Sequence, residues 1–339
     1  MLAASPIAAA SAAAQEAPSS QAPAVLRSPE RAAAPKERAH LGPARVSVGA
    51  YLNDIQNLDL KSHSYSIDIY LWFRWKDKDL DPASGFEFMN PYELWGHVQT
   101  KAYPQPVRLP NGDYYQVVRN QGRFSHKLKL YDYPFDEQNL TVEFEDSDMT
   151  TDKLVYEADP KALNVNPALE LPGFTIGRPE FKVYEVSYAT NFGDPRPPPK
   201  TAHSRAIIDI PIARPVMTYG VKLLLPILCV IFCAALMFLF HPKHVDARVG
   251  IGITALLTIV ALQITLNDAL PEVAYLVLMD KVYLGAYLYI IAGLAVVVKT
   301  TWLLEIEDYK RAIRLDRRSL VFLTLFYLVA TFILIYRAI

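Results

Sequence analysis

The sequence predicts an extracellular all-β domain, of the immunoglobulin-like sandwich type, followed by a bundle of four transmembrane helices. Two observations carry this prediction. From Val46 to about Pro215, apolar and polar residues alternate with a period of two, which is typical of half-buried strands. Four apolar stretches follow, and each is close to the roughly 20 residues that a helix needs to cross a bilayer. The predicted spans are 217–240, 249–270, 282–304 and 320–336.

Composition excludes several classes of function. The chain has 339 residues, which is enough for two domains, and 34 basic residues nearly balance 35 acidic ones. A nucleic-acid-binding protein would need a clustered basic face, so we expect no such partner. The two cysteines, Cys229 and Cys233, lie inside one apolar stretch and do not form a disulfide framework or metal site. No HExxH, GxSxG or P-loop motif occurs, so we expect neither an enzyme nor a cofactor.

The first 44 residues are rich in Ala, Pro and Ser. Small residues precede Gln15, as at the cleavage site of an export signal, but a basic first region and a strongly apolar core are missing. This leader is therefore interpreted either as a signal peptide or as a disordered segment.

The predicted β domain spans residues 45–215. Its clearest strands contain Ile67 to Trp75, Leu140 to Phe144 and Ile208 to Ile212, each with strict alternation. Asn111-Gly112 is a hairpin turn signal, and prolines at 195 and 197–199 indicate a stiff loop before the last strand. Many strands with turns at short intervals, and no long helical pattern, favour a sandwich.

The connections between the predicted helices of the segment 216–339 differ in charge. The third is basic, the first contains Lys243 and Arg248, and the second has no Lys or Arg until Lys281. By the positive-inside rule the first and third connections lie in the cytoplasm. The β domain and the C-terminus then lie outside, and we expect the inner (plasma) membrane with a periplasmic N-terminal domain.

A polar stripe marks the second predicted helix. Residues spaced four and three apart share one helix face, and both ends of the segment carry a carboxylate. The residues of this stripe are Asp246, Gly250, Thr254, Leu257, Ala261, Ile264 and Asp268. Intramembrane polar groups normally face a bundle interior or a water-filled cavity, so the stripe favours a pore lining. The alternative is a packed helix whose Gly and Thr allow close approach of its neighbours.

A motif between two predicted strands resembles a known family. The segment Tyr131 to Gln138, YDYPFDEQ, is similar to the signature loop of the pentameric ligand-gated ion channels, the Cys-loop receptor superfamily. Further similarities follow in the family's order: Trp75-Lys76-Asp77, then Arg214 before a first helix with Pro226, then the segments 247–254 and 270–271. The two cysteines that bracket the loop in animal members are replaced by His126 and Leu140, as in prokaryotic members.

The resemblance implies a homopentamer in membrane lipid, with the second helix of each subunit lining a pore for permeating cations. Leu257, Ala261 and Ile264 would form apolar rings that close by dewetting, while Gly250 and Thr254 would line the narrower cytoplasmic half. Asp246 would select charge and Asp268 would form an outer acidic ring. Arg248 lies two residues, or about 200°, further along the helix and should point away from the axis.

The resemblance also implies a coupling region between the domains. Asp136 and Arg214 would form a buried acid–base pair, with Pro134, Phe135 and Pro271 as contact points. The alternative is that Asp136 only caps a turn.

The agonist is left open as a small molecule, a proton or Ca²⁺. Candidate aromatic residues are Trp72 on one face and Tyr103, Tyr188 and Phe192 on the other. The loop that supplies a central aromatic residue in the family has none here between Glu145 and Met149. That acidic run, which includes Asp146 and Asp148, is typical of a Ca²⁺ site, a proton-responsive cluster or a solvated loop.

A second class of function is a membrane-anchored ligand-binding sensor that conducts no ions. Its four helices would serve only as an anchor. The polar stripe with acidic ends argues against this alternative.

Overall fold

Alternating residues form strands throughout the described part of the N-terminal domain. The computed structural model describes residues 42–190, 193 and 201–339. The leader expected before residue 42, Phe192 and the prolines at 195 and 197–199 lie outside the described residues. The strands and short helices of this domain, in chain order, are β1 (Ala44–Asp59), β2 (Ser64–Trp75), α1 (Pro82–Gly85), β3 (Phe86–Phe88), η1 (Leu94–Gly96), β4 (Val98–Lys101), β5 (Val107–Arg108), β6 (Tyr114–Ser125), β7 (Glu137–Asp146), β8 (Leu154–Val165), β9 (Thr175–Ile176), β10 (Glu180–Tyr188) and β11 (Thr201–Ala213).

Within the described residues, the first sheet has six strands in the order β4-β6-β2-β1-β8, with β5 also paired to β6. The antiparallel register of β1 and β2 places Val48 opposite Phe73 and Leu52 opposite Ile69. All four side chains are fully buried, because alternate residues of a strand point to the same face.

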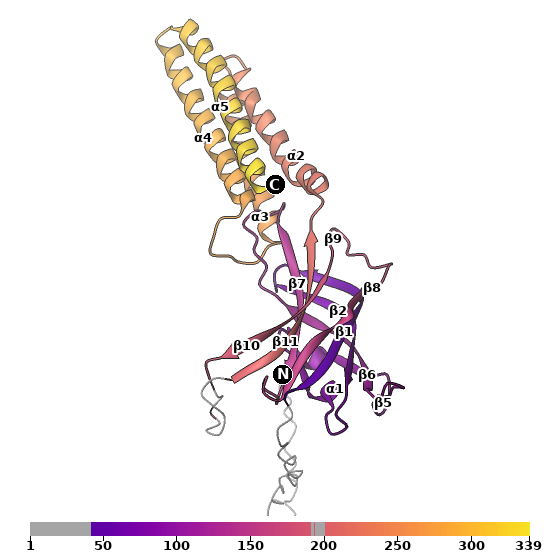
Figure 1. Cartoon of the computed structure of the whole chain (residues 1–339). Coiled ribbons are helices and arrows are strands. Elements are labelled where there is room, and N and C mark those ends of the chain that lie inside the picture. The colour runs from indigo at the N-terminus through magenta and orange to yellow at the C-terminus, as the bar shows by residue number, and fades with distance from the viewer. Residues whose placement is uncertain (1–41, 191–192, 194–200) are drawn as a thin grey trace, which may run out of the picture. The chain divides into compact units, whose positions relative to one another are not determined.

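In the part of the chain that the structure describes, the second sheet has five strands in the order β10-β11-β7-β3, with β9 paired to β11. Its buried face carries Val142 opposite Ile208 and Leu140 opposite Ile210. The rings of Phe73 on β2 and Phe144 on β7 meet edge to face with centroids 6.0 Å apart, which joins the two buried faces. Figure 1 labels strands of both sheets. Two sheets that share one apolar core form a sandwich, which confirms the predicted fold of this domain.

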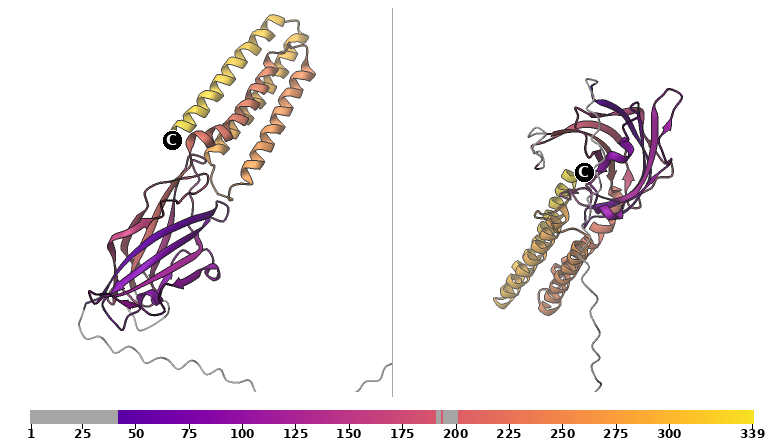
Figure 2. Two further views of the ribbon diagram at one scale, coloured as in Figure 1. Left: turned by 90° about the vertical axis from the view of Figure 1, so that its right-hand side faces the viewer. Right: turned by 90° about the horizontal axis from the view of Figure 1, so that it is seen from below.

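Four long helices follow, as the apolar stretches predicted. They are α2 (Val216–Ala235, continued by η2, Leu236–Phe238), α3 (Val245–Asn267), α4 (Leu278–Glu305) and α5 (Tyr309–Ala338). Each is long and apolar enough to cross a membrane. The helices run alongside one another (Figure 2), and α4 packs against the other three.

Three helices begin at least four residues earlier than hydropathy predicts, and one of them is α4, which begins at Leu278 rather than near Val282. Helix α5 begins at Tyr309 rather than near Leu320, because Asp308 caps its first turn by accepting a hydrogen bond from the Arg311 backbone N–H. Helix α3 begins at Val245 rather than Val249, so Asp246 lies in its first turn. The added first turns of α3 and α5 contain charged residues, which lower the mean hydropathy, so a hydropathy window does not include them.

Large apolar side chains on α5 face away from the bundle. Phe322, Phe326 and Phe332 are each about two-thirds exposed, at 67%, 65% and 67%. A face of this kind is incompatible with water and is expected of a helix that contacts lipid tails. The chain is therefore a multi-pass membrane protein.

Candidate pore surface and domain junction

Helix α3 has two faces with different environments. Arg248, Gly252, Ala255, Ile259 and Leu266 are buried, at the spacing of one helix face. The other face is exposed in the single chain and carries all seven residues of the polar stripe: Asp246, Gly250, Thr254, Leu257, Ala261, Ile264 and Asp268. The helix therefore packs against its own subunit on the side opposite the stripe.

The stripe combines polar and large apolar residues. Leu257 is 65% exposed and Ile264 is 57% exposed, beside the hydroxyl of Thr254 and the carboxylate of Asp246. A surface of this mixed kind suits a narrow aqueous path with apolar constrictions better than it suits lipid.

Arg248 is fully buried behind this stripe. Its Nε donates to the Met237 carbonyl at 2.6 Å, its Nη1 to the Thr300 hydroxyl at 3.0 Å, and its Nη2 to the Asp316 carboxylate at 2.5 Å. These bonds connect α3 to η2, α4 and α5. The side chain points away from the stripe, as the rotation between Asp246 and Arg248 predicts.

A second buried ion pair lies where the β domain meets α2. The Arg214 Nε donates to the Asp136 carboxylate at 3.4 Å, and both side chains are almost completely buried. The Gln138 amide donates to the other carboxylate oxygen at 2.6 Å. The rings of Tyr133, Phe174 and Tyr219 surround the guanidinium at 4.9, 4.6 and 5.3 Å. The aromatic faces add cation–π attraction to the pair, and burial raises the pKa of Tyr133.

The signature loop contacts the connection between α3 and α4. The Tyr131 ring stacks on Tyr275 with centroids 3.9 Å apart, and the Leu278 N–H donates to the Tyr131 carbonyl at 2.9 Å. The Leu130 N–H donates to the Tyr275 hydroxyl at 3.0 Å. Tyr275 was not among the predicted coupling residues, although an aromatic residue in this connection is visible in the sequence.

The predicted contact points have different surroundings. Pro134 and Phe135 are buried in the signature loop, and the Phe135 ring lies beside Gly220 of α2. Pro271 is half-buried at the end of α3, where it lines a pocket.

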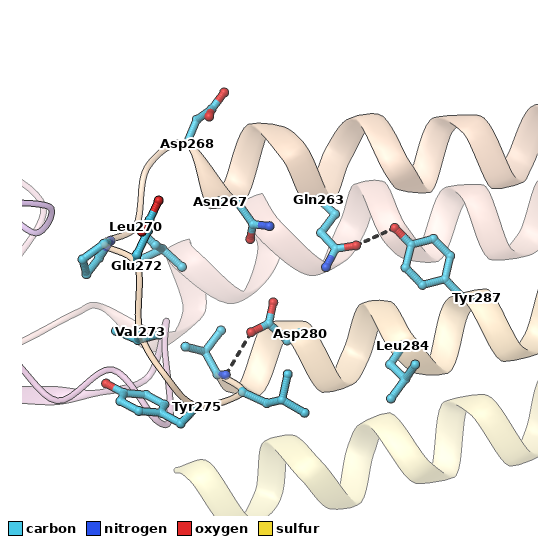
Figure 3. A pocket seen from close by; sticks show the side chains of 13 residues that line it. Gln263, Asn267, Asp268, Leu270, Glu272, Val273, Tyr275, Asp280, Leu284 and Tyr287 are labelled. Carbon is cyan, nitrogen blue, oxygen red and sulfur yellow. Dashed lines mark hydrogen bonds between the residues drawn. The ribbon is translucent and has the colours of Figure 1, made fainter.

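That pocket has a volume of about 650 Å³ and lies between the C-terminal end of α3 and the N-terminal end of α4 (Figure 3). Gln263 points toward Tyr287 and accepts a hydrogen bond from its hydroxyl (Figure 3). Asp280 accepts from the Val277 N–H at 3.0 Å. Asp268 and Glu272 also line the pocket, so this end of α3 is acidic.

The candidate aromatic residues are divided between the two sheets. Trp72 on β2 is half-buried, with its Nε1 3.4 Å from the Asp159 carboxylate. Tyr103 lies in a loop beside the same sheet, because its backbone N and O both bond to the side chain of Gln116 on β6. Tyr188 lies on β10 of the other sheet. Tyr103 thus lies on the side of the sandwich that carries Trp72, whereas the assignment of these residues to the two faces of a site between subunits stays a prediction. Phe192 lies outside the described residues.

The acidic run of β7 is mostly paired or buried. Arg205 bridges Glu143 at 3.0 Å and Glu145 at 2.9 Å, and Tyr188 donates to Glu145 at 2.9 Å. The interpretation of this run as a solvated loop was therefore wrong for Glu145, which is 3% exposed.

Asp146, in the same run, is also 3% exposed. It accepts N–H bonds from Asp148 and Met149, and burial raises the pKa of its carboxyl. Asp148 itself is exposed. Among the described residues, no group of three or more His, Cys, Asp or Glu side chains is arranged to hold a metal ion.

Comparison with known proteins gives many relatives, two of which are a receptor subunit and a bacterial channel, while no family model matches the chain. The chain is 23% identical over 273 residues to the gamma-aminobutyric acid receptor subunit beta-4 of Gallus gallus, a match that covers 74% of this chain and 54% of the receptor subunit. It is 22% identical over 306 residues to the proton-gated ion channel of Gloeobacter violaceus, covering 86% of this chain and 82% of that channel. The chain thus spans about half the length of the receptor subunit. Neither relative is an enzyme.

A β-sandwich followed by four membrane helices, with the signature loop at their junction, defines the class of pentameric ligand-gated ion channels. The chain has the fold and the sequence similarity of that class, the Cys-loop receptor superfamily, which confirms the resemblance inferred from its motifs. Its match to the bacterial channel extends over both domains.

Proposed function

We propose that this chain is the subunit of a homopentameric ligand-gated channel that conducts cations. The observation that supports this most is the exposed stripe of α3, which lies opposite the face that packs within the subunit. Five such stripes around an axis would line a pore. The proposed setting is the inner membrane of a bacterium, with the β domain in the periplasm, as the basic first and third connections indicate.

The proposed charge selection comes from Asp246. Five carboxylates roughly 5 Å from an ion would contribute about 0.8 kcal/mol each in bulk water, or about 4 kcal/mol together before screening. Asp268 would add an acidic ring at the outer mouth. Leu257, Ala261 and Ile264 would form the apolar constriction that opens and closes.

The proposed gating signal enters through the β domain and passes the junction. The Asp136–Arg214 pair and the Tyr131–Tyr275 stack connect the signature loop to α2 and to the outer end of α3. Protons are the favoured signal, for two reasons: the buried Asp146 has a raised pKa, and one relative is a proton-gated channel. A small molecule bound near Trp72, Tyr103, Tyr188 or Asp148 is the second candidate.

Cysteine accessibility tests the pore assignment. In a background with Cys229→Ser and Cys233→Ser, Thr254→Cys should react with a water-soluble thiol reagent and lose current. The matched control is Ala255→Cys, because Ala255 is buried within the subunit. Equal modification rates at the two positions would contradict the pore assignment.

Recordings in a NaCl gradient test charge selection. The reversal potential should follow sodium, and Asp246→Asn should move it toward chloride. A wild-type reversal potential that follows chloride would overturn cation selectivity. A purified pentamer that passes no current at any pH, with or without amines, would favour the anchored sensor.

A further inference from the structure

Asp316 is a buried carboxylate on α5, far from the exposed stripe in sequence and on a different helix. Its side chain is 3% exposed, and the Arg248 side chain that it pairs with is 0% exposed. Among the hydrogen bonds that Arg248 makes in the described chain, the other two go to the neutral groups of Met237 and Thr300. Asp316 is therefore the counter-charge of Arg248.

The position of Arg248 makes that counter-charge relevant to ions in the pore. Arg248 lies two residues from Asp246, in the first turns of α3, so its guanidinium is close behind the proposed selectivity ring. A guanidinium stays protonated in proteins, and a buried charge is screened much less than an exposed one. Without a partner, five such cations would oppose the field of five Asp246 carboxylates.

We propose that Asp316 is a selectivity-determining residue, because it cancels the field of Arg248 and leaves Asp246 to set the charge of the inner pore mouth. Asp316 acts through Arg248 and does not touch the permeating ion, so it is a positioning residue. The inference rests on the proposed channel function and extends charge selection to the outermost helix of the subunit.

A charge cycle of three variants tests it by reversal potential in a NaCl gradient. Asp316→Asn leaves Arg248 uncompensated and should lower the sodium-to-chloride permeability ratio by at least about threefold. Arg248→Gln leaves Asp316 uncompensated and should raise the ratio. The double variant Arg248→Gln with Asp316→Asn removes both charges while retaining polar side chains, and should lie within about twofold of wild type.

Asp308→Asn is the matched control. Asp308 caps the same helix and pairs with the exposed Arg311, so its neutralisation should leave the permeability ratio unchanged. If Asp316→Asn fails to assemble, the permeability ratios of Arg248→Gln and of the double variant are compared instead, and a difference between them supports the role of Asp316. A purely structural role would change yield or stability in these variants without moving the ratio.

The outcomes separate this inference from the proposed function. Conducting variants whose ratios all equal that of wild type would overturn the role of Asp316 and leave the channel intact. An anion-selective wild type would refute the cation assignment, while the direction of the shifts would still decide the role of Asp316. An assembled wild type without current would refute the proposed function and this inference with it.

Discussion

Two buried arginines show how single residues stabilise this chain. Arg214 lies at the junction of the two domains, and Arg248 lies within the helix bundle. Each guanidinium has one carboxylate partner in the described chain, Asp136 for Arg214 and Asp316 for Arg248. The first partner was predictable, because the family resemblance implies it. The second was not, because 68 residues separate Arg248 from Asp316 and no local pattern reports that contact.

The junction pair leads to a prediction about assembly. Asp136→Ala leaves Arg214 buried without its counter-charge, and breaking a buried pair in this way typically costs about 3–5 kcal/mol. We expect a much lower yield of folded oligomer, measured by size-exclusion chromatography of detergent-solubilised protein. We also expect a lower melting temperature, measured by thermal denaturation of the same protein. Asp132→Ala, in the same loop but exposed, is the control and should resemble wild type. Normal yield and stability of Asp136→Ala would refute the importance of the pair.

The buried carboxyl of Asp146 leads to a pH prediction. Burial raises its pKa above that of the unfolded chain, so the folded state prefers the neutral form. Its stabilising contribution is fully present below the unfolded pKa of about 3.9 and is lost as pH rises through the higher folded-state pKa.

The variant Asp146→Asn stays neutral, and its amide oxygen retains the N–H bonds from Asp148 and Met149. We therefore expect it to melt at a higher temperature than wild type at pH 7, with the difference shrinking toward pH 4. Asp148→Asn serves as an exposed control. A difference between Asp146→Asn and wild type that does not change with pH would contradict this assignment.

At the scale of elements, the two faces of α3 differ in whether a glycine position has room for a larger side chain. A Cβ added at Gly252 would collide with the Leu294 side chain of α4, including its Cγ at 3.0 Å. A Cβ added at Gly250 would meet nothing within 4 Å. Gly252 is therefore needed for close packing of α3 and α4, whereas Gly250 faces open space in the single chain.

Valine at each position tests this difference. Gly252→Val should lower stability by about 1–3 kcal/mol, as overpacking usually does, measured by thermal denaturation of the solubilised protein. Gly250→Val should keep wild-type stability and reduce single-channel conductance, because its side chain would enter the proposed pore. The reverse pattern, with Gly250→Val unstable and Gly252→Val neutral, would mean that the faces of α3 have been misassigned.

The sequence predicted most elements but not all of their limits. Alternation is a local property, so the sandwich strands were visible without knowledge of their partners. The early starts of α3 and α5 were missed, since Asp246 and the basic turn after Asp308 lower local hydropathy. The contact of Tyr275 with the signature loop was overlooked, because it depends on segments that are distant in the sequence.

At the scale of the whole molecule, the single chain leaves the stripe of α3 uncovered. Asp246 and Thr254 on this stripe are polar, and their contact with lipid tails would be costly for a lone subunit in the membrane. We expect native mass spectrometry in mild detergent to show five chains of 38.1 kDa each. Arg337→Ala, at the free end of α5, should leave this stoichiometry unchanged. A monomer or dimer as the largest species would contradict the proposed assembly.

The division of α3 into two non-overlapping faces also bears on how such a protein diverges over time. In the proposed pore, substitutions along the stripe from Gly250 to Ile264 would alter what passes through without touching the contacts within the subunit. Residues of the stripe can therefore change, and with them the conductance of the proposed channel, while the packing of the subunit stays the same. For the same reason, the positions of the stripe can be substituted one at a time in engineered variants with little risk of losing the fold.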